Sequence, residues 1–186
     1  MKRTGCIVVA VLVGLQEQVE ASWSEVENQY KRRFDLVPQL VETVQGAAEF
    51  EQTVLTDVIE ARASVGRVQL PDQLPTDPAQ LQAYMQAQAG LSGALGRLFA
   101  VAEQYPDLKA SQNFLSLQDQ LEGTENRIAV ARRDFIDDTR DYNAAIRRFP
   151  DRIVASFGGF EKTAQFSATE AEQGVPEVDF DFGQDE

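Results

Sequence analysis

The sequence predicts an all-α protein, an up-and-down antiparallel bundle of three or four long helices that ends in a disordered acidic tail. Apolar residues recur at steps of three and four over most of the chain, which is the period of an amphipathic helix. Prolines gather in short stretches between these periodic segments, where they mark loops. A seven-residue apolar repeat, typical of left-handed helix packing, runs through Phe114, Leu121, Ile128, Phe135, Tyr142 and Phe149.

The first fifteen residues resemble an export or anchor signal, because Lys2 and Arg3 precede an uncharged apolar run. The run covers residues 4–16 and spans about 20 Å as a helix, whereas a bilayer core is about 30 Å thick. We interpret residues 1–15 as a shortened membrane anchor. A signal peptide and an apolar first helix packed on the bundle are the alternatives. Acidic residues follow the run, so the positive-inside tendency places the bundle outside the cytoplasm.

The helical pattern begins after Gln16 and continues to about residue 65. Pro38 interrupts it, and because proline lacks a backbone N–H we expect the first helix to kink or break there. The prolines of residues 71–78 mark the next loop. Thr76 or Asp77 is suited to cap the following helix, with Pro78 in its first turn.

The last long helix is expected to begin near Leu108 or Ala110 and to end at Pro150. Within it, residues 132–150 read RRDFIDDTRDYNAAIRRFP. The apolar repeat predicts that Phe135, Tyr142 and Phe149 point into the bundle.

The charges of this same stretch raise the question of a metal site, since three aspartates share one side of the helix: Asp134, Asp138 and Asp141. Arginines at favourable helical spacing argue instead for a surface of ion pairs, such as Asp137 with Arg140. We therefore predict no metal site here and interpret the stretch as a charged helix face.

Residues 151–166 are expected to complete the bundle domain, which we place at residues 16–166. Ile153, Phe157, Phe160 and Phe166 suggest a short packing segment. Residues 167–186 are predicted to be a disordered acidic tail, since seven acidic and no basic residues lie between Glu170 and Glu186.

The net charge of −13 argues against a nucleic-acid partner, because phosphate binding requires a concentrated basic surface. The short basic cluster Lys31, Arg32 and Arg33 is interpreted as a solvated helix face. The chain contains no histidine, which removes the commonest general base and zinc ligand, and Cys6 is its only cysteine. The sequence therefore predicts a protein that is not an enzyme, with no catalytic residues, no cofactor and no metal.

Three blocks of the chain resemble the LemA family of bacterial proteins. They are ASWSEVENQYKRRFDLVPQLVETVQGAAEFEQTVLTDVIEARA (21–63), YPDLKASQNFLSLQDQLEGTENRIAVARRDF (105–135) and RDYNAAIRRFPDRIVASFGGF (140–160). The resemblance implies one N-terminal transmembrane helix followed by an antiparallel helical bundle, with no established catalytic activity. The chain departs from the family in its short apolar run and at Phe135-Ile136, where the family tends to have Tyr-Asn; Tyr142-Asn143 keeps that pair.

Three functions follow as hypotheses. The first is a single-pass, membrane-anchored bundle at the bacterial cell membrane that docks another membrane or envelope protein. The second is a soluble regulator or scaffold that associates with copies of itself. The third is a carboxylate-based hydrolase or metalloenzyme, which the composition disfavours.

Overall fold

The computed structural model describes residues 2–46, 50–68, 74–149 and 151–166, with side chains from Ile7 onward. Within these residues there are six helices and no strand, which confirms the all-α class. The helices are α1 (Lys2–Gln45), α2 (Gln52–Arg67), α3 (Pro78–Ala102), α4 (Pro106–Lys109), α5 (Gln112–Ala145) and α6 (Asp151–Gly158). The acidic tail predicted for residues 167–186 lies outside the described residues.

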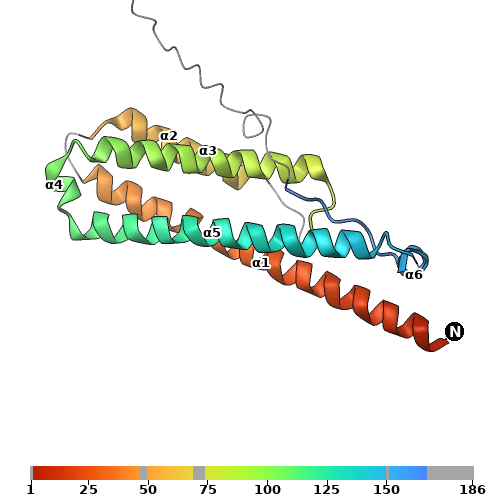
Figure 1. Cartoon of the computed structure of the whole chain (residues 1–186). Coiled ribbons are helices and arrows are strands. Elements are labelled where there is room, and N and C mark those ends of the chain that lie inside the picture. Colours follow the sequence, from red (N-terminus) through yellow and green to blue (C-terminus); the bar gives the residue numbers. More distant parts are fainter. Residues whose placement is uncertain (1, 47–49, 69–73, 150, 167–186) are drawn as a thin grey trace, which may run out of the picture.

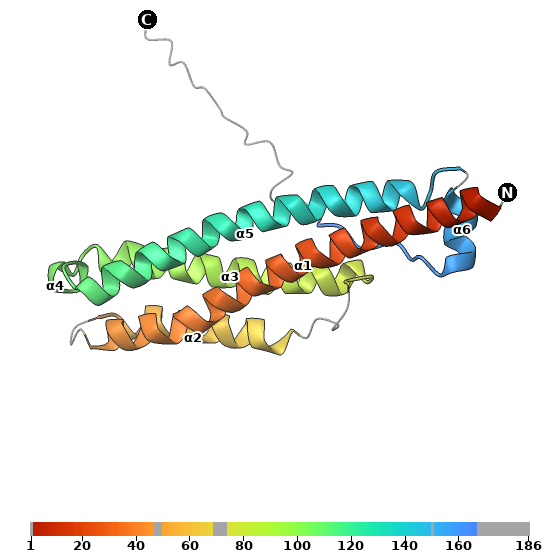
Figure 2. The ribbon, with the colours of Figure 1, turned by 90° about the horizontal axis from the view of Figure 1, so that it is seen from below.

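The four long helices lie in two pairs, α1 along α5 and α2 along α3 (Figure 1). The colours show that successive long helices run in alternating directions. The short helix α4 lies at one end of the molecule, and α6 packs against α1 at the opposite end, where the chain begins (Figure 2).

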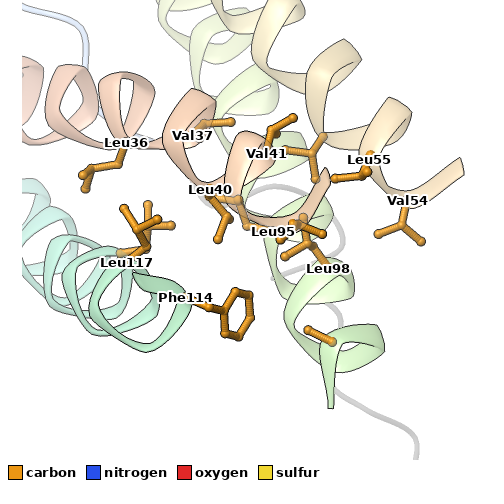
Figure 3. Packing of buried hydrophobic residues seen from close by; sticks show 14 of the residues in the cluster. Leu36, Val37, Leu40, Val41, Val54, Leu55, Leu95, Leu98, Phe114 and Leu117 are labelled. Carbon is orange, nitrogen blue, oxygen red and sulfur yellow. The ribbon is translucent and has the colours of Figure 1, made fainter. Parts of the chain in front are cut away.

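Buried apolar side chains form two clusters along the molecule. The first lies toward α4 and draws on all four long helices (Figure 3); it includes Leu36, Val37, Leu40, Val41, Val54, Leu55, Leu95, Leu98, Phe114 and Leu117. The second lies toward α6 and includes Leu12, Val19, Trp23, Val26, Tyr30, Leu81, Tyr84, Ile128, Phe135, Tyr142 and Ala155. Each large side chain buried in this way contributes about 1.5–3 kcal/mol, so the two clusters supply most of the drive for folding.

Helix α1 continues through Pro38, so of the kink or break expected there, the break is wrong. Proline leaves the carbonyl of the residue four positions earlier, Phe34, without its helical donor. In the structure Arg62 Nε of α2 donates to that carbonyl at 3.1 Å, and the Arg62 guanidinium lies 3.8 Å from the centre of the Phe34 ring. A neighbouring helix thus replaces the missing hydrogen bond, and α1 ends only at Gln45, before Gly46.

The start of α3 follows from local residues. The Asp77 side chain accepts a hydrogen bond from the Ala79 N–H at 2.9 Å, and Pro78 occupies the first turn of α3, as predicted. After α3 comes the short helix α4, and α5 begins at Gln112, shortly after the start expected near Leu108 or Ala110.

The apolar repeat of α5 holds from Phe114 to Tyr142, since all five of these positions are buried. Phe149, predicted to point inward, is 78% exposed. Helix α5 ends at Ala145, so the helical period no longer directs the side chain of residue 149. The expected packing segment is confirmed in part. Phe160 and Phe166 pack against the second apolar cluster, whereas Ile153 and Phe157 are exposed.

Candidate functional site

A buried polar layer separates the two apolar clusters, and Arg33 of α1 is at its centre with 1% exposure. Its Nη1 donates to Ser92 Oγ and to Glu125 Oε1, both at 2.5 Å. Its Nη2 donates to the Gln88 carbonyl at 3.1 Å and to Gln88 Oε1. We call Arg33, Gln88, Ser92 and Glu125 the polar layer; it joins α1, α3 and α5.

The interpretation of Arg33 as part of a solvated helix face is therefore wrong, although Lys31 and Arg32 are exposed. A signal was present in the sequence, because Tyr30, Arg33 and Val37 follow one another at steps of three and four on the buried face of α1. A basic cluster alone does not reveal which of its members lies on that face.

The polar layer reaches solvent at Glu125. A groove of about 450 Å³ is lined by Ser92 and Glu125 together with apolar side chains of α3 and α5. Glu125 is 40% exposed there, whereas Arg33 is enclosed. The two Nη atoms of Arg33 make four donor contacts, with residues of α3 and α5, so the guanidinium links three helices, while its Nε has no hydrogen-bond partner among the described residues.

Two tyrosines pack beside the polar layer. The Tyr30 and Tyr84 rings meet edge to face with centroids 5.5 Å apart, and the Tyr30 hydroxyl donates to Met85 Sδ at 3.7 Å. Burial raises the pKa of Tyr84 from 10.0 to about 12, against the opposite effect of a hydrogen bond with Gln88. Burial also raises the pKa of Tyr30.

The raised pKa of Tyr84 predicts a loss of stability in alkali. Between pH 10 and about 12 the folded protein keeps a proton that the unfolded chain releases, so stability is complete below pH 10 and falls as the pH rises through 12. The loss due to this group is on the order of 2 kcal/mol. Urea unfolding from pH 9 to pH 12 should therefore show a smaller decline for Tyr84→Phe than for the parent chain.

Tyr105→Phe provides the matched control, because Tyr105 packs on Phe50 far from the polar layer. Equal alkaline losses in the parent chain and in Tyr84→Phe would contradict this prediction.

The segment of residues 160–166, which we call the C-terminal segment, folds back along the bundle and is held by α5. Asn143 makes two hydrogen bonds with the backbone of Thr163: its Nδ2 donates to the carbonyl at 2.9 Å, and its Oδ1 accepts from the N–H at 3.1 Å. The Tyr142 hydroxyl donates to the Glu161 carbonyl at 3.0 Å. Phe166 then packs on Phe135, with ring centroids 5.1 Å apart.

The Tyr142-Asn143 pair noted in the sequence thus binds the protein's own chain. Beside it lies a groove of about 520 Å³ whose lining includes Glu20, Glu27, Tyr142 and Glu161.

The aspartates of α5 border a groove of about 420 Å³ between α1 and α5, lined in part by Glu25, Asp134, Asp137 and Asp138. Asp137 pairs with Arg140 at 2.9 Å, as predicted. Among the described residues, no group of three or more histidine, cysteine, aspartate or glutamate side chains is placed to hold a metal ion.

A surface of exposed apolar side chains lies where α1 begins. We call it the apolar end; it comprises Ile7, Val9, Val11, Val13, Phe149, Ile153 and Phe157. Helix α6 packs on this part of α1, so the residues gather at one end of the molecule (Figures 1 and 2). None of the described helices includes a stretch both long and apolar enough to cross a membrane.

Comparison with known proteins places these features in a family. The model of the LemA family matches residues 22–180. Magnetosome protein MamQ of Magnetospirillum gryphiswaldense is 28% identical over 170 residues, which cover 83% of this chain and 62% of MamQ. Protein LemA of Metamycoplasma hominis is 26% identical over 158 residues, which cover 85% of this chain and 68% of that protein. The chain thus spans less than two thirds of the length of MamQ.

Proposed function

The chain belongs to the LemA family, and from this premise we propose that it acts at the bacterial membrane as a non-enzymatic interaction module. In this proposal the first part of α1 holds an antiparallel helical bundle at the bilayer. The bundle lies on the extracytoplasmic side and docks another membrane or envelope protein.

The observation that carries this proposal is the exposure of apolar side chains around α1. Ile7 and Val11 are 65% and 53% exposed, and Val9 and Val13 are 41% and 40% exposed on other sides of the helix. Only Leu12 in this stretch is fully buried against the bundle. A helix that is apolar all round is stable where its whole circumference is buried, and each large side chain moved out of water gains about 1.5–3 kcal/mol.

The proposal is tested with the full chain expressed in a bacterium. We expect it to remain in the membrane pellet after an alkaline wash, and Val9→Asp with Val11→Asp to move it to the supernatant. Each aspartate opposes insertion by about 2.5–3.5 kcal/mol at the centre of a bilayer, so the two should shift the distribution by more than about a hundred-fold. Immunoblots of pellet and supernatant measure the result.

Ile59→Asp with Val130→Asp is the matched control, because these two residues are also exposed and apolar but lie on α2 and α5. It should leave the distribution unchanged. Release of the parent chain by the wash, or retention of the Val9/Val11 variant, would contradict anchoring through α1.

The docking role requires a separate experiment, in-cell crosslinking of the full chain followed by mass spectrometry. One dominant membrane or envelope protein among the captured proteins supports the interaction module. Capture of the chain alone favours the self-associating scaffold.

A further inference from the structure

Helix α6 has one face that packs on α1 and another that carries exposed apolar side chains. Ala155 is buried, and half-buried Val154 joins the same apolar cluster as Leu12 of α1. On the other face Ile153 and Phe157, four residues apart, are 51% and 90% exposed. Phe149, just before the helix, is 78% exposed. Such aromatic exposure is unusual for a short helix whose other face is packed.

The residues before, within and after this helix along the chain are basic on balance, although the chain as a whole is acidic. Arg147, Arg148, Arg152 and Lys162 outnumber Asp151 and Glu161, giving residues 147–162 a net charge of +2 in a chain of net charge −13. All four basic side chains are exposed. Exposed aromatic and aliphatic side chains bordered by arginine and lysine are the composition of helices that lie in the interface of an anionic membrane.

The position of α6 fits that partner. The helix packs on the part of α1 that carries Val8 and Leu12, which is the part we propose to enter the bilayer. When that part of α1 enters the membrane, α6 is carried to the membrane interface with it. Arginine side chains can reach phosphate there while Ile153 and Phe157 contact acyl chains.

We propose that the exposed face of α6, together with Phe149, is a second membrane contact that binds the surface of a bilayer containing anionic phospholipid. The proposal rests on the proposed function, since α6 lies beside the anchor, but it assigns lipid binding to residues outside the anchor. The α6 contact should depend on anionic lipid, whereas insertion of the uncharged stretch of α1 should not, so lipid charge distinguishes the two contacts.

The test is flotation of the full chain with vesicles of phosphatidylcholine alone or of phosphatidylcholine with phosphatidylglycerol. We expect tighter binding to the anionic vesicles. Each arginine near an anionic surface strengthens binding roughly five-fold, so Arg148→Glu with Arg152→Glu should weaken it by at least about 25-fold. Ile153→Ser with Phe157→Ser should weaken it on the order of ten-fold for each residue.

Matched controls are Arg127→Glu for charge, and Ile59→Ser with Val130→Ser for apolar surface, all at exposed positions away from the apolar end. These should bind as the parent chain does. Circular dichroism verifies that every variant keeps its helices.

The outcomes separate the two proposals. If the α6 variants bind anionic vesicles as tightly as the parent chain while Val9→Asp with Val11→Asp abolishes binding, the α6 contact is wrong and the anchor stands. If the Val9/Val11 variant still requires anionic lipid and the α6 variants do not bind, the α6 contact stands and the anchor is wrong. If the α6 substitutions leave vesicle binding intact and abolish self-association in sedimentation, a second copy covers this face and the lipid proposal is overturned.

Discussion

Replacement of Arg33 by alanine is expected to lower the free energy of unfolding by about 3–5 kcal/mol. The substitution removes the donors that satisfy Gln88, Ser92 and Glu125 and leaves a cavity between the two apolar clusters. Gln88 is 2% exposed, so its Oε1 is left buried without a donor, whereas water can replace the guanidinium at Ser92 and Glu125, which line a groove. Typical domains have a total stability of about 5–15 kcal/mol, so the variant is expected to be close to unfolding at room temperature.

The measurement is urea unfolding followed by far-ultraviolet circular dichroism, which reports the loss of helices. Arg32→Ala is a close control, because Arg32 is the preceding residue on the same helix and is exposed. Its effect should stay within about 0.5 kcal/mol. An Arg33→Ala chain as stable as Arg32→Ala would mean that the polar layer contributes nothing to stability.

Local sequence rules predicted the parts of this fold that depend on local chemistry. Asp77 and Pro78 begin α3 because their side chains fit a helix N-terminus wherever it lies. The repeat from Phe114 to Tyr142 is buried because it has helical period and length enough to face one partner, α1. Neither conclusion needs knowledge of the rest of the molecule.

The failed predictions depend on contacts between distant residues. Pro38 does not break α1, because Arg62, 28 residues from Phe34 in sequence, supplies the missing donor. Arg33 is buried because Gln88 and Glu125 converge on it from two other helices. A rule that treats proline as a helix breaker, or arginine as a surface residue, contains no information about such partners.

Of the two candidate membrane contacts, one could be predicted from the sequence and the other could not. The apolar run in α1 can be identified from the sequence alone, and it is the basis of the proposed anchor. The exposed face of α6 could not be predicted from the sequence. Ile153 and Phe157 have the apolar character of core residues, but α5 ends at Ala145 and both side chains are exposed in the separate helix α6. By contrast, the spacing of Asp137 and Arg140 on a helix predicted their ion pair, and the structure confirms it on the surface of α5.

Replacement of Asn143 by alanine is expected to lower the free energy of unfolding by about 2–4 kcal/mol and to release the C-terminal segment. Asn143 and Thr163 are 1% and 2% exposed, so the variant leaves the Thr163 N–H and carbonyl buried without the side chain that satisfies both. Each such unsatisfied group costs about 1–3 kcal/mol. Movement of the segment into water removes that penalty, at the cost of the packing of Phe166 on Phe135 and Trp23.

Trp23 makes this release measurable, because it is the only tryptophan in the chain and its ring centroid lies 6.4 Å from that of Phe166. In Asn143→Ala the fluorescence of Trp23 should shift to longer wavelength as water reaches the ring, before the helices unfold in urea. Asn126→Ala, at an exposed position on the same helix, should leave both the fluorescence and the stability unchanged. A single unfolding transition at the parent concentration of urea, with no early change at Trp23, would show that other contacts hold the segment. Two separate transitions would instead identify Asn143 as the residue that couples unfolding of the C-terminal segment to unfolding of the bundle.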